Sequence, residues 1–301
     1  MREERIRKAE GGRGKAEREV KHSAVVEPQA APVPGGVYLC QVDENVSCGA
    51  CCGLYNCADA SREHLDAELA YRTERFRNIP RDPDAITDFQ VQLERRDPRP
   101  RPYPDFYHCP FLGFIGRNGR RVGCMLHPLA EGNAGIDYRG LSFYGGLACR
   151  DYFCPTYRSL SDARREAVKA VCRDWYIYGL VITEELLLAA FFAEIEARLG
   201  RPLTAAVIQA HPAACGAILE FLELKLNWPY RHAGCRGPGN YFFNDGLYPR
   251  PEIDYARLGV PSSRHDAILR ELSSAFSRPE ELRRAEGLIE DMLERILRAL
   301  A

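Results

Sequence analysis

Apolar residues recur at helical spacing over most of the C-terminal half of the chain. One such stripe consists of Leu187, Phe191, Ile195 and Leu199. Thr183 precedes the stripe as a candidate N-cap, and Gly200 follows it in Gly-Arg-Pro, a sequence typical of a helix end. Side chains three or four residues apart share one face of a helix, so the pattern predicts an amphipathic helix between these two residues.

The same spacing predicts further helices in this half. The first is capped by Ser159 or Ser161 and has Val168, Val171, Cys172 and Trp175 on one stripe. Another covers about 212–226, and two final helices follow. The last helix begins near Ser277, has Pro279 in its first turn, and repeats apolar residues at Leu282, Ala285, Ile289, Met292 and Ile296. Residues 227–251 are rich in glycine, proline and aromatic residues. They are predicted to form an ordered irregular loop.

The N-terminal half contains fewer regular elements. A helix is predicted over 62–77, with Ser61 as its N-cap and prolines at 80 and 83 ending it. The proline-rich run 97–104 is predicted to be an extended surface connector. Two short apolar runs, 111–115 and 121–125, flank an Asn-Gly pair, which predicts a β-hairpin.

These elements predict a mainly α fold with an irregular, loop-rich cysteine-cluster region and a small β-hairpin. Three parts are expected along the chain. They are a disordered tail over 1–34, a cysteine-cluster metal-binding domain over 35–157, and a helical region over 158–301 that packs on it. The tail is assigned on its charged and proline-rich composition, which does not supply a hydrophobic core.

Composition narrows the classes of function. The 301 residues carry a net charge of -1, so no basic field favours a nucleic-acid partner. No uninterrupted apolar stretch of about 18 residues is present, and no membrane span is expected. The first residues lack the apolar core of a secretory signal, so a cytoplasmic location is predicted. In a reducing compartment, the 12 cysteines are expected to bind metal or act in catalysis rather than form disulfides.

Eight cysteines between residues 48 and 154 form short motifs. They are Cys48, Cys51, Cys52 and Cys57 in C-x2-C-C-x4-C, Cys109 in Cys-Pro-Phe-Leu, Cys124 after Gly123, and Cys149 and Cys154 in Cys-Arg-Asp-Tyr-Phe-Cys-Pro. Thiolates are soft ligands that suit zinc or iron–sulfur centres, and proline after a ligand cysteine stiffens its loop. We therefore predict that all eight bind metal.

The adjacent pair Cys51 and Cys52 leaves the number of centres open. Neighbouring side chains point in different directions, so the two thiols rarely occupy equivalent positions on one ion. Two sites of four cysteines, or one four-cysteine site with spare thiols, are both compatible with eight thiols. Aromatic residues close in sequence to the cysteines favour a water-poor site, and Arg150 beside Cys149 is a candidate for offsetting thiolate charge.

Histidines and the remaining cysteines provide other candidates. His108 and His127 flank motif cysteines, and either would complete a zinc site of three cysteines and one histidine, although a supporting or surface position is the alternative. His232 and Cys235 have ligand spacing, but a pair of loop residues is the favoured interpretation. Cys172 and Cys215 lie in predicted helices and are expected to be buried structural residues. These histidines and cysteines add no second metal motif.

The order of the motifs resembles the YkgJ-type family, named for its CxxCxxCC motif and regarded as a zinc- or iron-chelating domain. The resemblance covers about residues 40–157 and depends on Cys48-Gly-Ala-Cys-Cys, Cys109-Pro-Phe-Leu, Gly-Cys124, Cys149-Arg and Cys154-Pro. It departs from the family at Asn45, where the family has its leading cysteine. Cys40 or Cys57 would replace that ligand, and Cys57 is favoured because it lies in the same short segment.

This resemblance implies metal or cluster binding with an undefined biological role. An iron–sulfur cluster is slightly favoured over zinc, because the ligands are nearly all sulfur and their surroundings are aromatic. The cysteine region also resembles that of a flagellin lysine methylase, so a protein-modifying enzyme is an alternative by analogy only. A zinc-ribbon-like binding module is a third interpretation, which the near-neutral charge disfavours. The substrate, the partner and the oligomeric state are not predicted.

Overall fold

The chain is mainly helical and contains a small antiparallel hairpin, which confirms the predicted fold class. A computed structural model describes residues 38–116, 118–235, 237–241 and 248–301. The predicted disordered tail, 1–34, lies outside the described residues. All described residues belong to one compact unit, Val33–Ala301.

Short elements and two longer helices make up the first half of the described chain. They are η2 (Ala50–Cys52), α1 (Arg62–Arg77), α2 (Pro83–Arg96), β1 (Leu112–Ile115), β2 (Arg121–Cys124), η3 (Arg139–Leu141), α3 (Gly145–Ala148) and α4 (Thr156–Ser159). Ser61 caps α1 as predicted, and its side chain accepts a hydrogen bond from the backbone of His64. Leu65, Leu69 and Phe76 anchor this helix in the core.

Helix α2 was missed by the sequence interpretation, which took Pro83 only as the end of the preceding helix. Pro83 instead occupies the first helical position, where a missing N–H costs nothing. Asp82 is the N-cap and accepts a hydrogen bond of 2.9 Å from the backbone N–H of Ala85. The proline thus begins a helix, which buries Ile86 and Phe89.

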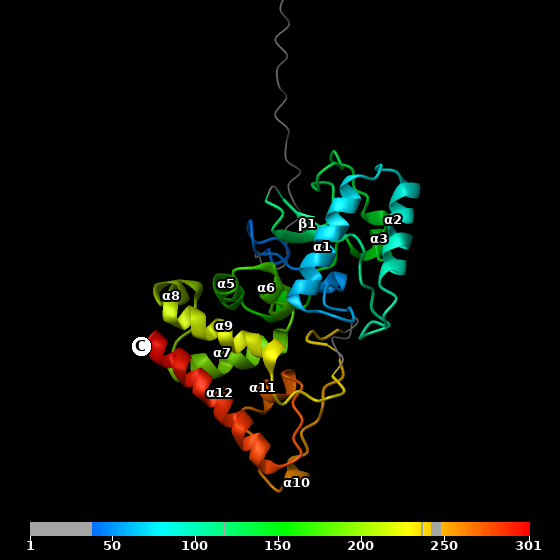
Figure 1. Cartoon of the computed structure of the whole chain (residues 1–301). Helices are drawn as coiled ribbons and strands as arrows, with labels where there is room; N and C mark the ends of the chain where they lie inside the picture. Colours follow the sequence, from blue (N-terminus) through cyan, green and yellow to red (C-terminus); the bar gives the residue numbers. More distant parts are fainter. Residues whose placement is uncertain (1–37, 117, 236, 242–247) are drawn as a thin grey trace, which may run out of the picture. The chain divides into compact units, whose positions relative to one another are not determined.

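The predicted hairpin is present as β1 and β2, and Leu112 pairs with Cys124 at its open end. The strands are bound to α1 through Thr73, whose hydroxyl accepts a hydrogen bond of 2.7 Å from the backbone of Phe114. Gly113 lies against this helix, and an added Cβ would come within 2.7 Å of the Thr73 hydroxyl. The hairpin and α1 therefore pack at close range and form the support for Cys124 (Figure 1).

Helices dominate the second half. They are α5 (Asp162–Val171), α6 (Trp175–Val181), α7 (Glu185–Leu199), α8 (Ala205–Ala210), α9 (Pro212–Asn227), α10 (Tyr255–Leu258), α11 (Asp266–Glu271) and α12 (Pro279–Leu300). The helices predicted from the stripes of 187–199, 212–226 and 282–296 correspond to α7, α9 and α12. Helices α8 and α10 are short and were not predicted.

One predicted helix is divided in two. The stripe that ends at Trp175 was expected to be continuous, but α5 ends at Val171, and α6 begins at Trp175. Asp174 causes the restart, because its carboxylate accepts hydrogen bonds from the backbone of Tyr176 and Ile177 at 2.9 and 3.2 Å. Helix α6 is buried along its whole length.

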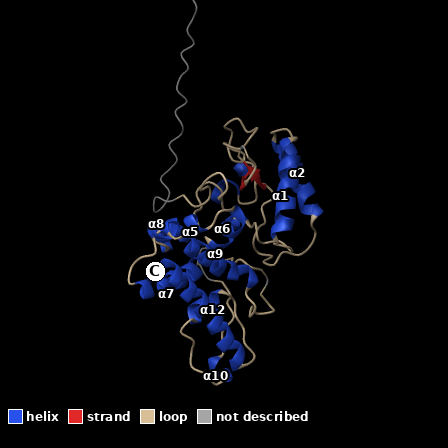
Figure 2. Ribbon diagram, turned by 60° about the vertical axis from the view of Figure 1, so that its left-hand side comes forward, coloured by secondary structure: helices blue, strands red, loops and turns tan. Residues whose placement is uncertain are grey.

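Helix α9 is central to the packing of the second half. It packs against α12, α5, α6 and α8, and α12 also packs on α7 (Figures 1 and 2). Its buried residues include Ala214, Ala217 and Ile218. Small side chains at this surface allow neighbouring helices to approach closely.

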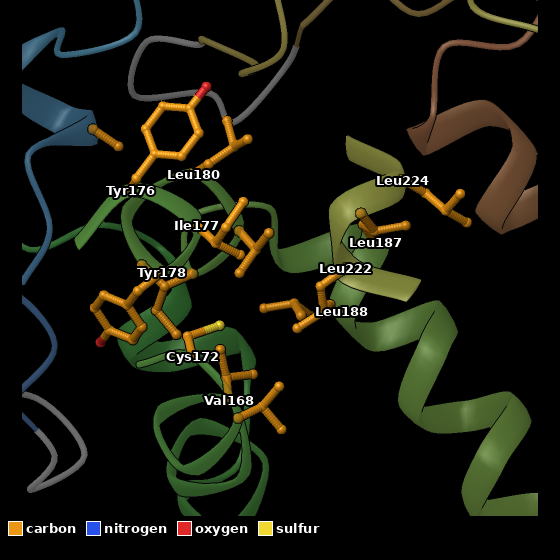
Figure 3. Packing of buried hydrophobic residues seen from close by; sticks show 14 of the residues in the cluster. Val168, Cys172, Tyr176, Ile177, Tyr178, Leu180, Leu187, Leu188, Leu222 and Leu224 are labelled. Carbon is orange, nitrogen blue, oxygen red and sulfur yellow. The ribbon is translucent and has the colours of Figure 1, made fainter. Parts of the chain in front are cut away.

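One hydrophobic core joins the helices to the cysteine region. Figure 3 shows part of it, where Cys172 lies among Val168, Tyr178 and Leu188. Tyr178 also reaches the cysteine region, because its hydroxyl donates a hydrogen bond of 2.9 Å to the carbonyl of Leu39. The burial predicted for Cys172 and Cys215 is confirmed, although Cys172 caps the end of α5 and lies outside the helix itself.

Within the described residues, no single helix has the length and apolar character needed to cross a membrane. Helices α6 and α7 meet those criteria only when taken together, and they are bent by 89° at the break between them.

Candidate metal centre

A short turn presents the first three motif cysteines. Cys48 lies just before η2, which contains Cys51 and Cys52, and Gly53 ends η2 with a left-handed φ of +82°. The carbonyl of Gly49 accepts hydrogen bonds from the backbone N–H groups of Cys52 and Leu54 at 3.1 and 3.2 Å. Local backbone hydrogen bonds therefore hold this turn in place without a longer helix or strand.

The first group of thiols, the Cys40 set, consists of Cys40, Cys48, Cys51 and Cys154. An antiparallel bridge between Gln41 and Ser47 brings Cys40 and Cys48 opposite one another. The N–H of Cys48 donates a 3.0 Å hydrogen bond to the carbonyl of Cys40. The thiols of Cys51 and Cys154 are electrostatic neighbours, and each shifts the pKa of the other. Four thiols from three separate segments thus become neighbours.

The electrostatics of the Cys40 set agree with this arrangement. Burial raises the pKa of Cys40 to about 11, with Cys154 adding to the rise. Burial also raises the pKa of Cys48, and Cys40 and Cys154 contribute. The neighbouring thiol of Cys154 is the main cause of the raised pKa of Cys51, and Cys51 in turn lowers the pKa of Cys154. All four thiols therefore affect one another's ionisation.

The second group, the Cys52 set, consists of Cys52, Cys109, Cys124 and Cys149. The N–H of Cys109 donates a 2.9 Å hydrogen bond to the carbonyl of Cys52. The N–H of Leu112 donates to the carbonyl of Cys109 at 3.4 Å, and Leu112 pairs with Cys124 across the hairpin. The hairpin therefore brings Cys109 and Cys124 together, as the sequence interpretation expected of its two arms.

Cys149 completes the Cys52 set from the surface. Its sulfur lies 3.2 Å from the hydroxyl of Ser142. Burial is the main cause of the raised pKa of Cys52, and the thiolates of Cys109, Cys124 and Cys149 raise it further. Cys40 makes a smaller contribution to the same pKa, so the two sets are neighbours.

Cys57 lies in a different environment. Its thiol donates hydrogen bonds to the carbonyls of Asp59 and Leu54, at 3.2 and 3.6 Å. Burial raises its pKa to about 11, and the nearby guanidinium of Arg72 opposes this rise. The prediction that Cys57 is a ligand stays a prediction, but its hydrogen bonds stabilise the backbone before α1 rather than join it to another thiol.

His108 has both ring nitrogens engaged in hydrogen bonds. Nδ1 donates to the carbonyl of Gly53 at 2.7 Å, and Nε2 accepts from a guanidinium nitrogen of Arg72 at 2.8 Å. Burial lowers its pKa to about 3, and the charge of Arg72 lowers it further. The neutral imidazole therefore braces the Cys52 set against α1 in this arrangement.

The other candidate ligands form local interactions. His127 accepts a hydrogen bond of 3.1 Å from the backbone of Leu129, and burial lowers its pKa. Nδ1 of His232 accepts a 2.9 Å bond from the backbone of Gly234, within the same turn as Cys235. His232 and Cys235 thus form a local turn, and their role as ligands stays untested.

Two arginines near the Cys52 set were not recognised from sequence. Arg72 is buried and donates to the carbonyl of Cys109 at 3.4 Å, and its charge lowers the pKa of that cysteine against the opposing effect of burial. Arg139 donates to the carbonyl of Cys149 at 3.4 Å and lowers the pKa of Cys124. The signal for Arg72 was its position on the apolar face of the predicted helix 62–77.

Arg150, the predicted compensating charge, is directed elsewhere. Its guanidinium is 2.9 Å from the carboxylate of Asp137, and its side chain is 64% exposed. The same carboxylate forms a two-pronged pair with Arg139. The aromatic surroundings are also uneven, since Phe111 is buried whereas Phe143 is 72% exposed. The site therefore has a buried side and a side that faces solvent.

The cysteine side chains are of a type that suits a thiophilic metal, but their arrangement in the structure does not form a ready ligand group. All 12 cysteines are free thiols. Within the described part of the chain, no group of three or more His, Cys, Asp or Glu side chains is arranged so that it could hold an ion as it stands. Thiols such as Cys48 instead form hydrogen bonds to backbone carbonyls, here that of Gly179 at 3.7 Å. Such bonds belong to protonated thiols, and metal binding requires their deprotonation.

No family model, no curated protein and no solved structure matches this chain. The resemblance to the YkgJ-type family therefore depends on the cysteine motifs alone, and stays a prediction.

Proposed function

We propose that this chain is a metal-binding protein in which thiolates of residues 40–154 hold an iron–sulfur cluster or zinc. The observation that carries the proposal is the joining of cysteine segments that are distant in the sequence, since backbone bonds connect Cys40 to Cys48 and Cys52 to Cys109, and all these thiols are free. Sulfur-only donors are typical of structural zinc and of iron–sulfur centres. Protein purified without oxygen is expected to contain one or two centres per chain.

Burial adds support for a bound metal. Four thiolates brought together in a water-poor region repel one another, and each buried charge costs free energy unless it is compensated. A thiophilic cation removes that cost by replacing the protons. Burial raises the pKa of Cys40, Cys48 and Cys52, so the thiolate forms of these residues need a compensating positive charge. When bound, the metal would supply cross-links to a loop-rich segment, or redox chemistry in the case of a cluster.

The test is metal analysis and visible spectroscopy of full-length protein purified anaerobically, combined with alkylation of the native thiols. Bound iron with a charge-transfer spectrum, or bound zinc without one, supports the proposal and identifies the metal. Finding neither metal, with all motif cysteines freely alkylated in the native protein, rejects it. A variant with Cys172→Ala and Cys215→Ala is the matched control, because both residues are buried in the helical half. It should retain the full metal content.

The two alternative functions predicted from the sequence have weaker support. The likeness to a flagellin lysine methylase depends on analogy, and no contact among the described residues favours it. The net charge of -1 disfavours the zinc-ribbon alternative. A cytoplasmic location likewise stays a prediction.

A further inference from the structure

We infer that the chain contains two separate four-thiolate metal sites, one built from the Cys40 set and one from the Cys52 set. This inference depends on the proposed metal binding and extends it to the number of sites and their ligands. It assigns Cys40 as a ligand and leaves Cys57 in neither site.

The connections between segments provide the first argument for two sites. The Cys40 set links the Gln41–Ser47 bridge to the segment at Cys154 through Tyr157, which contacts the sulfur of Cys40 and donates its N–H to the carbonyl of Cys154. The Cys52 set links the same turn to the hairpin instead, through the backbone bond from Cys109 to Cys52. Each set therefore has its own supporting elements, and both meet only at the turn that contains η2.

The adjacent cysteines provide the second argument. Successive side chains leave the backbone in different directions, and two neighbouring thiols are poorly placed to bind one ion in equivalent positions. Here the backbone carbonyl of Cys52 accepts a hydrogen bond from Cys109 of the Cys52 set, while the thiol nearest to Cys51 in electrostatic terms is that of Cys154. The peptide bond between them consequently joins the two sites. Each set has four thiols, the number that a structural zinc ion or a cluster requires.

Tyr157 shows why Cys40 belongs to the first site. Its hydroxyl donates or accepts at 3.7 Å from the sulfur of Cys40 and accepts a 2.7 Å bond from the backbone of Leu39. Its own N–H donates to the carbonyl of Cys154 at 3.1 Å. Tyr157 thus holds Cys40 beside Cys154, its side chain contacting the first and its backbone the second. Cys57 has no comparable bond among its described interactions.

The two sites also differ in charge. Arg72 and Arg139 donate hydrogen bonds of 3.4 Å to the carbonyls of Cys109 and Cys149 in the Cys52 set, whereas the hydroxyl of Tyr157 neighbours the Cys40 set. Four thiolates with a divalent ion carry a net negative charge, which nearby guanidinium groups stabilise. The sites are therefore expected to bind the same metal with unequal affinity, the Cys52 set more tightly.

Native mass spectrometry of the reduced full-length chain with added Zn²⁺ tests the inference. Wild-type protein should bind two ions, Cys40→Ser one ion, and Cys57→Ser two. The double variant Cys40→Ser/Cys154→Ser should still bind one, because both changes affect the same site. Cys40→Ser/Cys109→Ser should bind none.

Three results would overturn the two-site assignment. They are a wild-type stoichiometry of one ion, loss of an ion in Cys57→Ser with none lost in Cys40→Ser, and equal stoichiometry in the two double variants. A wild-type chain that binds one ion retains the proposed function while rejecting two sites. A chain that binds no zinc and contains no iron when purified rejects both.

A measurement on wild-type protein covers the case in which variants fail to fold. Zinc is extracted stepwise with a chelator, and alkylation at each cysteine is followed by peptide mapping. Two sites predict two steps, with the four thiols of the Cys40 set losing protection together and those of the Cys52 set together in a later step. Simultaneous exposure of all eight thiols, or protection of Cys57 by zinc, contradicts the assignment.

Discussion

Lys225 Nζ lies 2.8 Å from Glu184 Oε2, and the exposed fractions of the two side chains are only 1% and 2%. Lys225 belongs to α9, and Glu184 precedes α7. The lysine also donates to the carbonyl of Glu271 at 3.1 Å, and Glu184 accepts from Asn240. This buried ion pair therefore fixes the start of α7, the end of α11 and the loop at Asn240 to one point.

Replacing Lys225 with methionine should lower the free energy of unfolding by about 3–5 kcal/mol, because Glu184 would remain buried without a counter-ion. Urea unfolding followed by circular dichroism measures this loss. The double variant Lys225→Met/Glu184→Leu should recover most of it. Removal of an exposed pair, by Arg295→Met opposite Glu220, should cost less than about 1 kcal/mol. Equal losses at both positions would show that burial does not determine the effect.

His265 predicts a pH dependence of stability. Its imidazole is buried and lies 3.3 Å from Glu290 of α12 and 3.6 Å from Glu194 of α7. Arg198 of α7 and the neighbouring Arg264 pair with Glu290, so the cluster is balanced while the imidazole is neutral. Burial lowers the pKa of His265. The unfolded chain, with an ordinary pKa near 6.5, therefore takes up this proton more readily.

Stability from His265 should be fully present above about pH 6.5 and should fall as the pH drops below that value. The slope for one proton is at most about 1.4 kcal/mol per pH unit. Urea unfolding across this range should show the slope in the wild type and a smaller slope in His265→Gln. An unchanged slope would assign the pH dependence to other groups.

Gly53 is required by a close backbone approach. Its φ is +82°, and an added Cβ would lie 2.0 Å from the carbonyl oxygen of Tyr107. Gly53→Ala should therefore displace His108 and Cys109, lowering stability by more than about 1 kcal/mol and reducing metal retention. Gly200→Ala is the matched control, because its φ is +66° and its Cβ would meet no atom within 4 Å. Gly200→Ala should retain metal, and its stability should fall only by the free-energy cost of placing alanine in the left-handed conformation.

Arg139→Gln should weaken metal binding by about 10- to 100-fold, as expected for a residue that supports ligands without binding the metal. The guanidinium of Arg139 lowers the pKa of Cys124 and bonds to the carbonyl of Cys149. Arg150→Gln serves as the control, since Arg150 is exposed and pairs with Asp137 instead. Competition with a zinc chelator measures both. Equal affinities in the two variants would contradict the assigned role of Arg139.

Local signals explain why so much of the helical half was predictable. In α7 and α12, an apolar stripe is aligned with the buried face, and Gly200 ends α7 as predicted. The predicted N-cap Thr183 was wrong, because Glu184 precedes α7 and its side chain forms no capping bond. Helix α2 was missed because a proline such as Pro83 occurs both after the end of one helix and at the first position of the next. Here the capping bond of Asp82 shows that it begins a helix. Asp174 divided α5 from α6 in the same manner.

The site was predictable in its residue type and less so in its grouping. Motif spacing identifies cysteines within a segment, and Cys57 was preferred to Cys40 because it is near in sequence. The position of Cys40 is instead set by its contact with Tyr157, which lies more than one hundred residues away in the sequence. Arg72 was similarly hidden, because its partner at Cys109 follows only after α1 and the hairpin have packed together. Long-range contacts of this kind leave no local pattern.

Tyr55 extends the influence of the cysteine turn into the helices. Its hydroxyl donates a 2.7 Å hydrogen bond to the carbonyl of Tyr176 in α6, and its ring is buried. A ligand that binds only the folded chain raises the unfolding free energy in proportion to the logarithm of its concentration above the dissociation constant. Through this bond, the helices and the cysteine turn are expected to unfold in one cooperative transition. The unfolding temperature of the helices, followed by circular dichroism, should therefore report metal occupancy in a cysteine region that itself contains little helix.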